Sequence, residues 1–332
     1  MNTPSDLPPF LAARRDALPM DLAFASARGP YSVWANRLMR AWRAALPPMD
    51  GAAKGQRDGV DVTLEFATGA AASGRFVLPK GKGPFPAVLL LHDHGGAFDQ
   101  GWRKLFDDPA STDTRTRHYD GTAPASAFLE AGFAVLCLDA LGWGARLTGG
   151  YEGQQALAAN TLGLGWSLAG LVAAEDVQAA AWLAKQPEID AMRIGAFGFS
   201  FGGFRAWQVA ALSPDIAAHA SLSWMACRAD LMQANAPLLA GQSAFYMLHP
   251  TIAARADFAD LAGLGVQKPQ FYCSGRGDRH MPEASVKRAW TQIARIAKAA
   301  GVPAPDTAMH DAGHTCPRAS LDEAITFLSQ HL

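Results

Sequence analysis

The 332-residue chain carries a formal net charge of −1 at pH 7, and 49% of its residues are hydrophobic against 18% charged. This composition is typical of a globular enzyme with a sizeable core, and it excludes a disordered or fibrous chain. Because the chain has no excess of basic residues to neutralise phosphates, nucleic acid is not expected as a partner.

Cysteine spacing and the N-terminal residues bear on compartment and cofactors. Cys137, Cys227, Cys273 and Cys316 are widely separated and form no C-x-x-C motif, so neither a zinc site nor a disulfide framework is expected. The first residues lack the basic and apolar segments of a signal peptide, and no apolar run reaches about 18 residues. We therefore expect a soluble, cytoplasmic protein with no membrane partner. The sequence leaves homo-oligomer formation open.

Residues 1–58 differ from the rest of the chain in being rich in arginine. Within them Trp34, Leu38 and Trp42 recur at helical spacing, which predicts an amphipathic helix that packs on the main domain and ends before Pro47. A helix that binds a membrane surface or nucleic acid is the alternative. We interpret residues 1–58 as an N-terminal helical extension and residues 59–332 as the main domain.

From Val60 onward the pattern changes to that of strands. Alternating apolar residues over 60–66 and 76–78 predict an antiparallel hairpin. Uninterrupted apolar runs predict strands covered on both faces, with helical stretches between them. This alternation is typical of a mostly parallel, doubly wound α/β sheet with crossover helices. The predicted buried strands are 86–91, 134–138, 194–197 and 270–273, and the helical stretches are 125–131, 169–185, 204–212 and 284–300.

The segment Gly198–Gly202 has the pattern G-x-S-x-G between a predicted buried strand and a predicted helix. A serine on so tight a turn has a strained backbone, and side chains two residues before and after would collide, so glycine is required at both places. The pattern predicts Ser200 as a nucleophile. The N-terminus of the following helix favours an oxyanion, and Phe201 N–H is the expected donor.

A serine hydroxyl needs a histidine to take its proton. In this kind of fold the order along the chain is serine, acid, histidine, so only residues after Ser200 qualify. We predict His314, which lies in a glycine-containing loop just before the last helix, as the general base. His310 is the alternative, and His280 and His331 are weaker candidates.

Asp278 lies in a loop after the predicted strand 270–273, where ligand-facing groups collect in doubly wound sheets. We predict that it orients His314. The alternative is that Asp278 only caps the helix that begins near residue 282. Asp306 and Asp311 are weaker candidates because neither follows a buried strand with a suitable loop.

The loop His92–Gly96, with the sequence His-Asp-His-Gly-Gly, follows the predicted strand 86–91 and is of the type that supplies a second oxyanion donor. We expect the N–H of His94 in this role, with that of Gly95 as the alternative. His92, Asp93 and His94 could also be interpreted as a metal cluster. Side chains at a strand end diverge, however, and no second cluster with ligand spacing follows, so no metal is expected.

The stretch 224–268 is too long for a simple crossover and predicts a cap over the site. Trp224 and Trp143 are candidates for the wall of an acyl pocket, and ordinary core positions are the alternative. Arg146, Arg228 and Arg276 could meet a substrate carboxylate or could be solvated surface.

With these residues in place, the chain resembles the α/β-hydrolase superfamily across roughly residues 60–332, and within it bacterial acetyl xylan esterases and their dienelactone-hydrolase-like neighbours. The segments that carry the finer match are Gly198–Gln208, Ser223–Met225, Gly241–Phe245 and Leu248–Pro250. The resemblance implies a carboxylic ester hydrolase that needs no cofactor. Our leading hypothesis is an esterase that forms an acyl-enzyme on Ser200 and hydrolyses it with water activated by His314. We expect small esters with short acyl groups of the acetyl type, partly from the resemblance and partly because aromatic side chains crowd the nucleophile, namely Phe199, Phe201, Trp224 and Trp143. Dienelactone hydrolases use cysteine as nucleophile, so Ser200 argues against that activity.

Two other functions fit the same residues. A serine peptidase or amidase would use the same triad, although the first 58 residues are too few for the large gating domain that such enzymes usually carry. A binding protein without catalysis is the second alternative. Such proteins commonly lose one member of the triad, whereas Ser200, Asp278 and His314 are all present.

Overall fold

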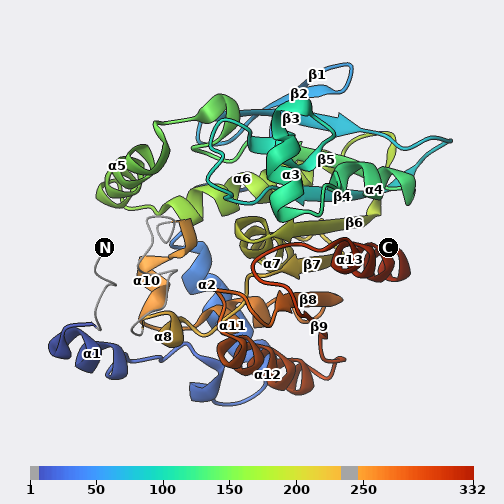
Figure 1. Ribbon diagram of the computed structural model, residues 1–332. Coiled ribbons are helices and arrows are strands. Elements are labelled where there is room, and N and C mark those ends of the chain that lie inside the picture. The colour runs from blue at the N-terminus through green and yellow to red at the C-terminus, as the bar shows by residue number, and fades with distance from the viewer. Residues whose placement is uncertain (1–6, 233–245) are drawn as a thin grey trace.

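The computed structural model describes residues 7–232 and 246–332, and the central element of this part is one mixed sheet (Figure 1). Its nine described strands have the order β1-β2-β3-β5-β4-β6-β7-β8-β9. The first three strands and β5 pair antiparallel, and every pairing from β5 onward is parallel. The strands are β1 (Lys54–Asp58), β2 (Asp61–Glu65), β3 (Ala71–Val77), β4 (Phe85–Leu91), β5 (Ala134–Leu138), β6 (Ile189–Phe199), β7 (Ala218–Leu222), β8 (Gln270–Gly275) and β9 (Asp306–His310).

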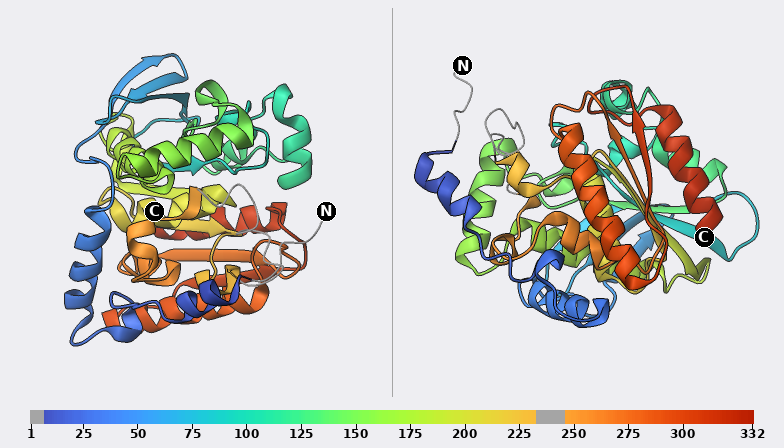
Figure 2. Two further views of the ribbon diagram at one scale, coloured as in Figure 1. Left: turned by 90° about the vertical axis from the view of Figure 1, so that its left-hand side faces the viewer. Right: turned by 90° about the horizontal axis from the view of Figure 1, so that it is seen from below.

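Helices cover both faces of the sheet, as the uninterrupted apolar strands predict. In β4, Ala87, Leu89 and Leu91 belong to one hydrophobic cluster, and Val88 and Leu90 belong to the other, because successive side chains of a strand point to opposite faces. The first cluster includes residues of α2 (Tyr31–Arg43), α6 (Leu168–Leu183), α7 (Phe201–Leu212), α11 (Phe258–Gly263) and α12 (Glu283–Ala300). The second includes residues of α4 (Pro124–Glu130) and α13 (Arg318–His331). Figure 2 shows α12 and α13 on opposite sides of the sheet.

The remaining helices are short or lie outside these layers: α1 (Pro9–Asp16), η1 (Phe24–Ser26), η2 (Gly101–Leu105), η3 (Pro109–Ser111), α3 (Thr112–His118), η4 (Gly144–Arg146), α5 (Gly150–Gly163), α8 (Arg228–Leu231) and α10 (Pro250–Ala253). Over the described ranges, no single helix has the length and hydropathy to cross a membrane. The helices α5 and α6 meet that criterion only as a pair bent by 87°.

The N-terminal segment packs through α2 on helices of the main domain. Trp34, Leu38 and Trp42 are buried, as their spacing predicts, and α2 contacts α12. Arg43 also donates to the carbonyl of Leu212 at the end of α7, at 2.7 Å. The segment is not helical throughout, because β1 falls inside residues 1–58. All five residues of β1 are exposed, so it carries no apolar alternation from which a strand could be predicted.

The segment between β7 and β8 contains α8, α10 and α11. Of the stretches that carry the finer resemblance, Gly241–Phe245 lies outside the described residues. The described part packs on the main domain around Trp224, whose ring lies 4.3 Å from that of Phe204 and 4.9 Å from that of Phe258, centroid to centroid. These contacts fix Trp224 next to α7, the helix that begins after Ser200.

Candidate active site

Ser200 occupies the turn between β6 and α7 with φ +56° and ψ −124°, a conformation that costs energy for any residue but glycine. The flanking glycines make this turn sterically feasible. A Cβ on Gly198 would lie 2.2 Å from the carbonyl carbon of Gly202, and a Cβ on Gly202 would lie 1.9 Å from the carbonyl oxygen of Leu91. Both glycines are therefore required by close backbone approach, which is the steric reason for the G-x-S-x-G pattern.

His314 and Asp278 reach Ser200 from the loops that follow β9 and β8. The distance from His314 Nε2 to Ser200 Oγ is 2.8 Å, and the distance from His314 Nδ1 to Asp278 Oδ2 is 2.7 Å. A carboxylate can only accept, so Nδ1 donates to it and Nε2 is left to accept the serine proton. The three residues lie at the carboxyl ends of parallel strands, the usual place of sites in doubly wound sheets.

The backbone around Asp278 stabilises its charge. Its Oδ1 accepts from the N–H groups of His280, at 2.8 Å, and Met281, at 3.2 Å. Burial alone would raise the pKa of Asp278, but the hydrogen bond and charge of His314, together with these two donors, outweigh burial and lower the pKa. The N-cap residue of α12 is Pro282, and none of the described side chains caps that helix, so Asp278 does not act as its cap.

The alternative acids and bases lie elsewhere. The side chain of Asp311 is 95% exposed and pairs with Arg276, and Asp306 is an exposed residue at the start of β9. His310 ends β9, and His331 is at the end of α13. His280 is the nearest rival, because its ring lies 4.6 Å from that of His314, but it is not hydrogen bonded to Ser200 in the described structure.

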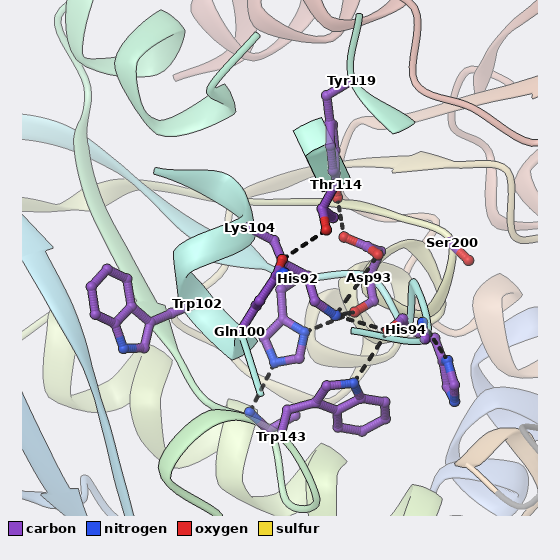
Figure 3. A network of polar contacts seen from close by, with 12 residues as sticks. His92, Asp93, His94, Gln100, Trp102, Lys104, Thr114, Tyr119, Trp143 and Ser200 are labelled. Carbon is purple, nitrogen blue, oxygen red and sulfur yellow. Dashed lines mark hydrogen bonds and ion pairs between the residues drawn. The ribbon is translucent and has the colours of Figure 1, made fainter. Parts of the chain in front are cut away.

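Ser200 and His314 open into a cavity of about 230 Å³. Trp224 and Met247 line it together with His94 and Gly95 of the loop His92–Gly96. The other predicted pocket residue, Trp143, does not line this cavity. It is fully buried, and its indole N–H donates to the carbonyl of His94 at 3.2 Å (Figure 3). Its ring stacks on that of Phe201.

The predicted oxyanion donors come from two parts of the chain, the start of α7 and the loop His92–Gly96. Phe201 is the first residue of α7, and N–H groups in the first turn of a helix have no acceptor within it. His94 and Gly95 line the cavity, and within residues 7–232 and 246–332 neither N–H has a hydrogen-bond acceptor. Free N–H groups next to a nucleophile are what an oxyanion requires, so Phe201, His94 and Gly95 stay the predicted donors.

The arginines that the sequence suggested for a substrate carboxylate are engaged elsewhere. Arg146 forms a two-point ion pair with Glu175, Arg228 donates to the carbonyl of Ala256, and Arg276 pairs with Glu283 and Asp311. Instead, Arg117 from α3 and Arg279 line the cavity. Because Arg279 directly follows Asp278 in the chain, its position near the site could have been predicted from the sequence. No motif in the sequence indicates that Arg117 lies there.

The side chains of His92 and His94 are used in hydrogen bonds and point apart. His92 donates from Nδ1 to the carbonyl of Asp93 and accepts the N–H of Ala140, while Nε2 of His94 lies 3.3 Å from Oε1 of Gln154. Burial, followed by the charge of Lys104, lowers the pKa of His94 to about 4, so this ring is neutral at pH 7. Across the described part of the chain, no group of three or more histidine, cysteine, aspartate or glutamate side chains could hold a metal ion.

A hydrogen-bonded serine, histidine and aspartate at this edge of the sheet define a serine hydrolase of the α/β-hydrolase fold. The chain belongs to the family described as X-Pro dipeptidyl-peptidase (S15 family), whose model matches residues 73–256, more than half of the 332 residues. The match includes Ser200 and the loop His92–Gly96, but it ends before Asp278 and His314.

Known proteins similar to the chain are named as hydrolases and esterases. A Bacillus subtilis (strain 168) protein named "Putative hydrolase YtaP" is 25% identical over 263 residues, which are 79% of this chain and 84% of that protein. A glucuronoyl esterase from Solibacter usitatus superposes with a TM-score of 0.69 at 14% identity, covering 95% of this chain and 98% of that one. Acetyl xylan esterase 1 from a Thermoanaerobacterium species gives 0.56 at 18% identity, covering 98% and 99%. Because both identities are below 25%, these two similarities show that the chain shares their fold and nothing more.

Proposed function

We propose that this serine hydrolase cleaves carboxylic esters, with small esters of short acyl groups as its substrates. The observation that carries the proposal is the hydrogen-bonded chain Ser200, His314 and Asp278 opening into a small cavity. The names of the structurally similar proteins, glucuronoyl esterase and acetyl xylan esterase, support the same reaction class.

In the reaction, Oγ of Ser200 attacks the ester carbonyl while Nε2 of His314 takes the serine proton. The carbonyl electrons move to its oxygen, where the N–H groups of Phe201 and His94 or Gly95 stabilise the negative charge. Collapse of this intermediate expels the alcohol, which receives the proton from His314 and leaves an acyl group on Ser200. Water then attacks the acyl carbon while His314 takes one of its protons, and the bond to Oγ of Ser200 breaks. The acid is released as His314 returns the proton to Oγ. Throughout, Asp278 holds the imidazole in place and stabilises its positive charge.

The charges of the cavity favour an ester over the amino terminus of a peptide. A dipeptidyl-peptidase acts two residues from a free amino terminus, so its site has to hold a protonated amine. Among the described lining residues the only carboxylate is Asp93, which is 0% exposed and accepts a hydrogen bond from Tyr119. Segment 233–245 contains no aspartate or glutamate. Arg117 and Arg279 make the lining positive, and that charge repels an amine.

The size of the cavity favours short acyl groups. Trp224 is held by Phe204 and Phe258, and its indole N–H contacts Sδ of Met247, so both lining side chains belong to packed clusters. Each methylene that does not fit changes discrimination by about 1 to 3 kcal/mol. We therefore expect the specificity constant to be largest for acetyl to butyryl esters of one alcohol and smaller for octanoyl and palmitoyl esters.

The test uses purified protein, 4-nitrophenyl esters of increasing acyl length and an alanyl-prolyl 4-nitroanilide. We expect ester turnover, no release of nitroaniline, and a loss of at least about 10³-fold in kcat for Ser200→Ala with the fold unchanged. A fluorophosphonate probe should label Ser200 of the wild-type protein. Faster cleavage of the dipeptidyl anilide than of every ester would replace this proposal with peptidase activity, and a maximum at octanoyl or longer would overturn the short-chain preference.

A further inference from the structure

A lysine with no access to solvent lies beneath the loop His92–Gly96. Lys104, at the end of η2, is 0% exposed. Its ammonium donates to two consecutive backbone carbonyls, those of Asp93 at 2.9 Å and His94 at 2.8 Å, and lies 3.9 Å from Oδ2 of Asp93 (Figure 3). Moving an ammonium out of water costs several kcal/mol, so a site like this needs compensating oxygen partners. Within the described part of the chain, both hydrogen-bond acceptors of Lys104 belong to this one loop.

The groups around Lys104 keep the arrangement fixed. The hydroxyl of Tyr119 donates to Oδ1 of Asp93 at 2.5 Å, and the indole of Trp143 donates to the same His94 carbonyl as Lys104. Burial lowers the pKa of Lys104, while the charges of Asp93, Asp139 and Asp99 act in the opposite direction. Because the hydrogen-bond partners of Lys104 among the described residues are all oxygen atoms, the ammonium form is the one that satisfies the site.

The hydrogen bonds of Lys104 determine where two N–H groups of the loop point. In a trans peptide the C=O and N–H bonds point in opposite directions. When Lys104 binds the carbonyl of Asp93, the N–H of His94 points away from Lys104, and when it binds the carbonyl of His94, the N–H of Gly95 does the same. His94 and Gly95 line the cavity with Ser200, and Figure 3 shows Asp93 and His94 between the ammonium and Ser200.

We propose that Lys104 is a positioning residue of the oxyanion hole: it binds the carbonyl sides of the peptide groups 93–94 and 94–95, so that their N–H sides face the oxygen of the substrate attacked by Ser200. The inference rests on the proposed ester hydrolysis. The ammonium also has an electrostatic role. A fixed positive charge on the carbonyl side of a peptide group polarises that group and strengthens the hydrogen bond from its N–H.

Gly95 is required for the same arrangement of Lys104, Asp93 and the loop. Gly95 has φ +57°, and a Cβ there would lie 2.3 Å from Oδ2 of Asp93 and 3.6 Å from Nζ of Lys104. A side chain at this position would therefore displace Asp93. The loop sequence His-Asp-His-Gly-Gly thus places both the N–H groups and the carboxylate that faces the lysine.

The test compares Lys104→Met with Lys268→Met. Lys268 is a matched control because its ammonium also donates to two backbone carbonyls, those of Ala210 and Ser213, away from the cavity. The measurements are kcat and KM for an acetyl ester, the Ki of a trifluoromethyl ketone, and the melting temperature. The ketone becomes an oxyanion when Oγ of Ser200 bonds to its carbonyl carbon and His314 takes the serine proton, so its Ki reports on the oxyanion hole.

We expect Lys104→Met to lower kcat by roughly tenfold to hundredfold, less than or comparable to removal of a direct donor, with KM unchanged and the ketone Ki raised by a similar factor. Lys268→Met should lower the melting temperature without changing kcat or Ki. A Lys104→Met protein with wild-type kcat and Ki would overturn the proposal, as would one in which KM alone changes.

If Lys104→Met cannot be purified, Lys104→Gln keeps one donor group under the loop, and a smaller but parallel change in kcat and Ki is expected. Wild-type values for Lys104→Gln would equally overturn the role.

Labelling by a fluorophosphonate separates this proposal from the proposed function, because it needs Ser200 and the oxyanion hole but no natural substrate. Wild-type protein that is labelled at Ser200 but hydrolyses no ester defeats the ester hydrolase assignment. Equal labelling rates for wild type and Lys104→Met defeat the positioning role, whatever the substrate.

Discussion

Asp278 binds His314 through a 2.7 Å hydrogen bond between Oδ2 and Nδ1, while its other oxygen accepts two backbone N–H groups. The carboxylate side chain has 0% exposure, whereas that of His314 retains 13%. The two backbone N–H groups therefore hold the carboxylate of Asp278 in place, and the imidazole of His314 lines the cavity. An ionised, immobile carboxylate in this position selects the tautomer with the proton on Nδ1.

Replacing this acid by its amide should remove most of the catalysis without unfolding the protein. Asp278→Asn can still accept the backbone N–H groups, but its amide favours the wrong tautomer of His314, and we expect kcat for ester hydrolysis to fall by about 10³- to 10⁴-fold. Asp311→Asn is the matched control, because Asp311 is exposed and lies in the loop of His314 without contacting it. Comparable losses in the two variants would contradict the assignment of Asp278.

The triad and its turn were predictable from the sequence because local geometry encodes them. Gly198 and Gly202 are required by backbone approach within a few residues, and Asp278 and His314 each follow a strand that apolar residues mark. These are properties of short stretches of chain. The order of serine, acid and histidine then assigned the roles.

Residues whose roles depend on packing across the sheet were not predictable in this way. Lys104 carries no motif, and its function depends on η2 lying under the loop after β4. The sequence leaves Trp143 as a candidate for either the pocket wall or the core, and the structure buries it behind His94. Arg146, a candidate for binding substrate, is instead paired with Glu175, twenty-nine residues later in the chain. No spacing rule links such positions.

Activity should be independent of divalent metal ions. The rings of His92 and His94 are occupied by hydrogen bonds, and the described residues form no metal-binding group. Prolonged treatment with EDTA, followed by gel filtration, should leave kcat for an acetyl ester unchanged. Loss of activity that zinc or another divalent ion restores would contradict this and would point to His92, Asp93 and His94 as ligands.

Stability should fall as the pH decreases below 6.5, in part because of His219. This residue of β7 is 0% exposed, and neither ring nitrogen has a hydrogen-bond partner among the described residues. Burial, followed by the charge of Lys268, lowers its pKa from 6.5 to about 3. The unfolded chain then binds a proton below pH 6.5 that the folded protein cannot bind, so the free energy of unfolding decreases from pH 6.5 downward and is unaffected above it.

His219→Leu should remove this contribution. Between pH 6.5 and 5 one such histidine accounts for at most about 2 kcal/mol. Urea unfolding at pH 7 and pH 5 should show a smaller difference for His219→Leu than for the wild type, with His331→Gln, at the exposed end of α13, as the control. An unchanged difference in His219→Leu would show that His219 is not the group responsible.

Esters that carry a free carboxylate should be better substrates than neutral esters of the same size. Arg117 and Arg279 line the cavity, and in the described part of the chain neither forms an ion pair with a carboxylate. Methyl hydrogen succinate and its amide, methyl succinamate, match in shape and differ in charge. A hydrogen bond between a guanidinium and a carboxylate is stronger than one between neutral groups, and we expect a preference of about tenfold in kcat/KM for the charged ester. The preference should shrink at high salt.

Arginine variants locate the source of that preference. Arg117→Gln and Arg279→Gln should each reduce the ratio of the two specificity constants, mainly by lowering kcat/KM for the charged ester. Arg276→Gln is the control, because Arg276 lies near Asp278 in the chain but pairs with Glu283 and Asp311 outside the cavity lining. If methyl succinamate were the better substrate, or if both cavity variants kept the wild-type ratio, the positive lining would have no part in substrate choice. A lower ratio in Arg117→Gln and Arg279→Gln, with Arg276→Gln unchanged, would make these two arginines the residues that select the charge of the substrate.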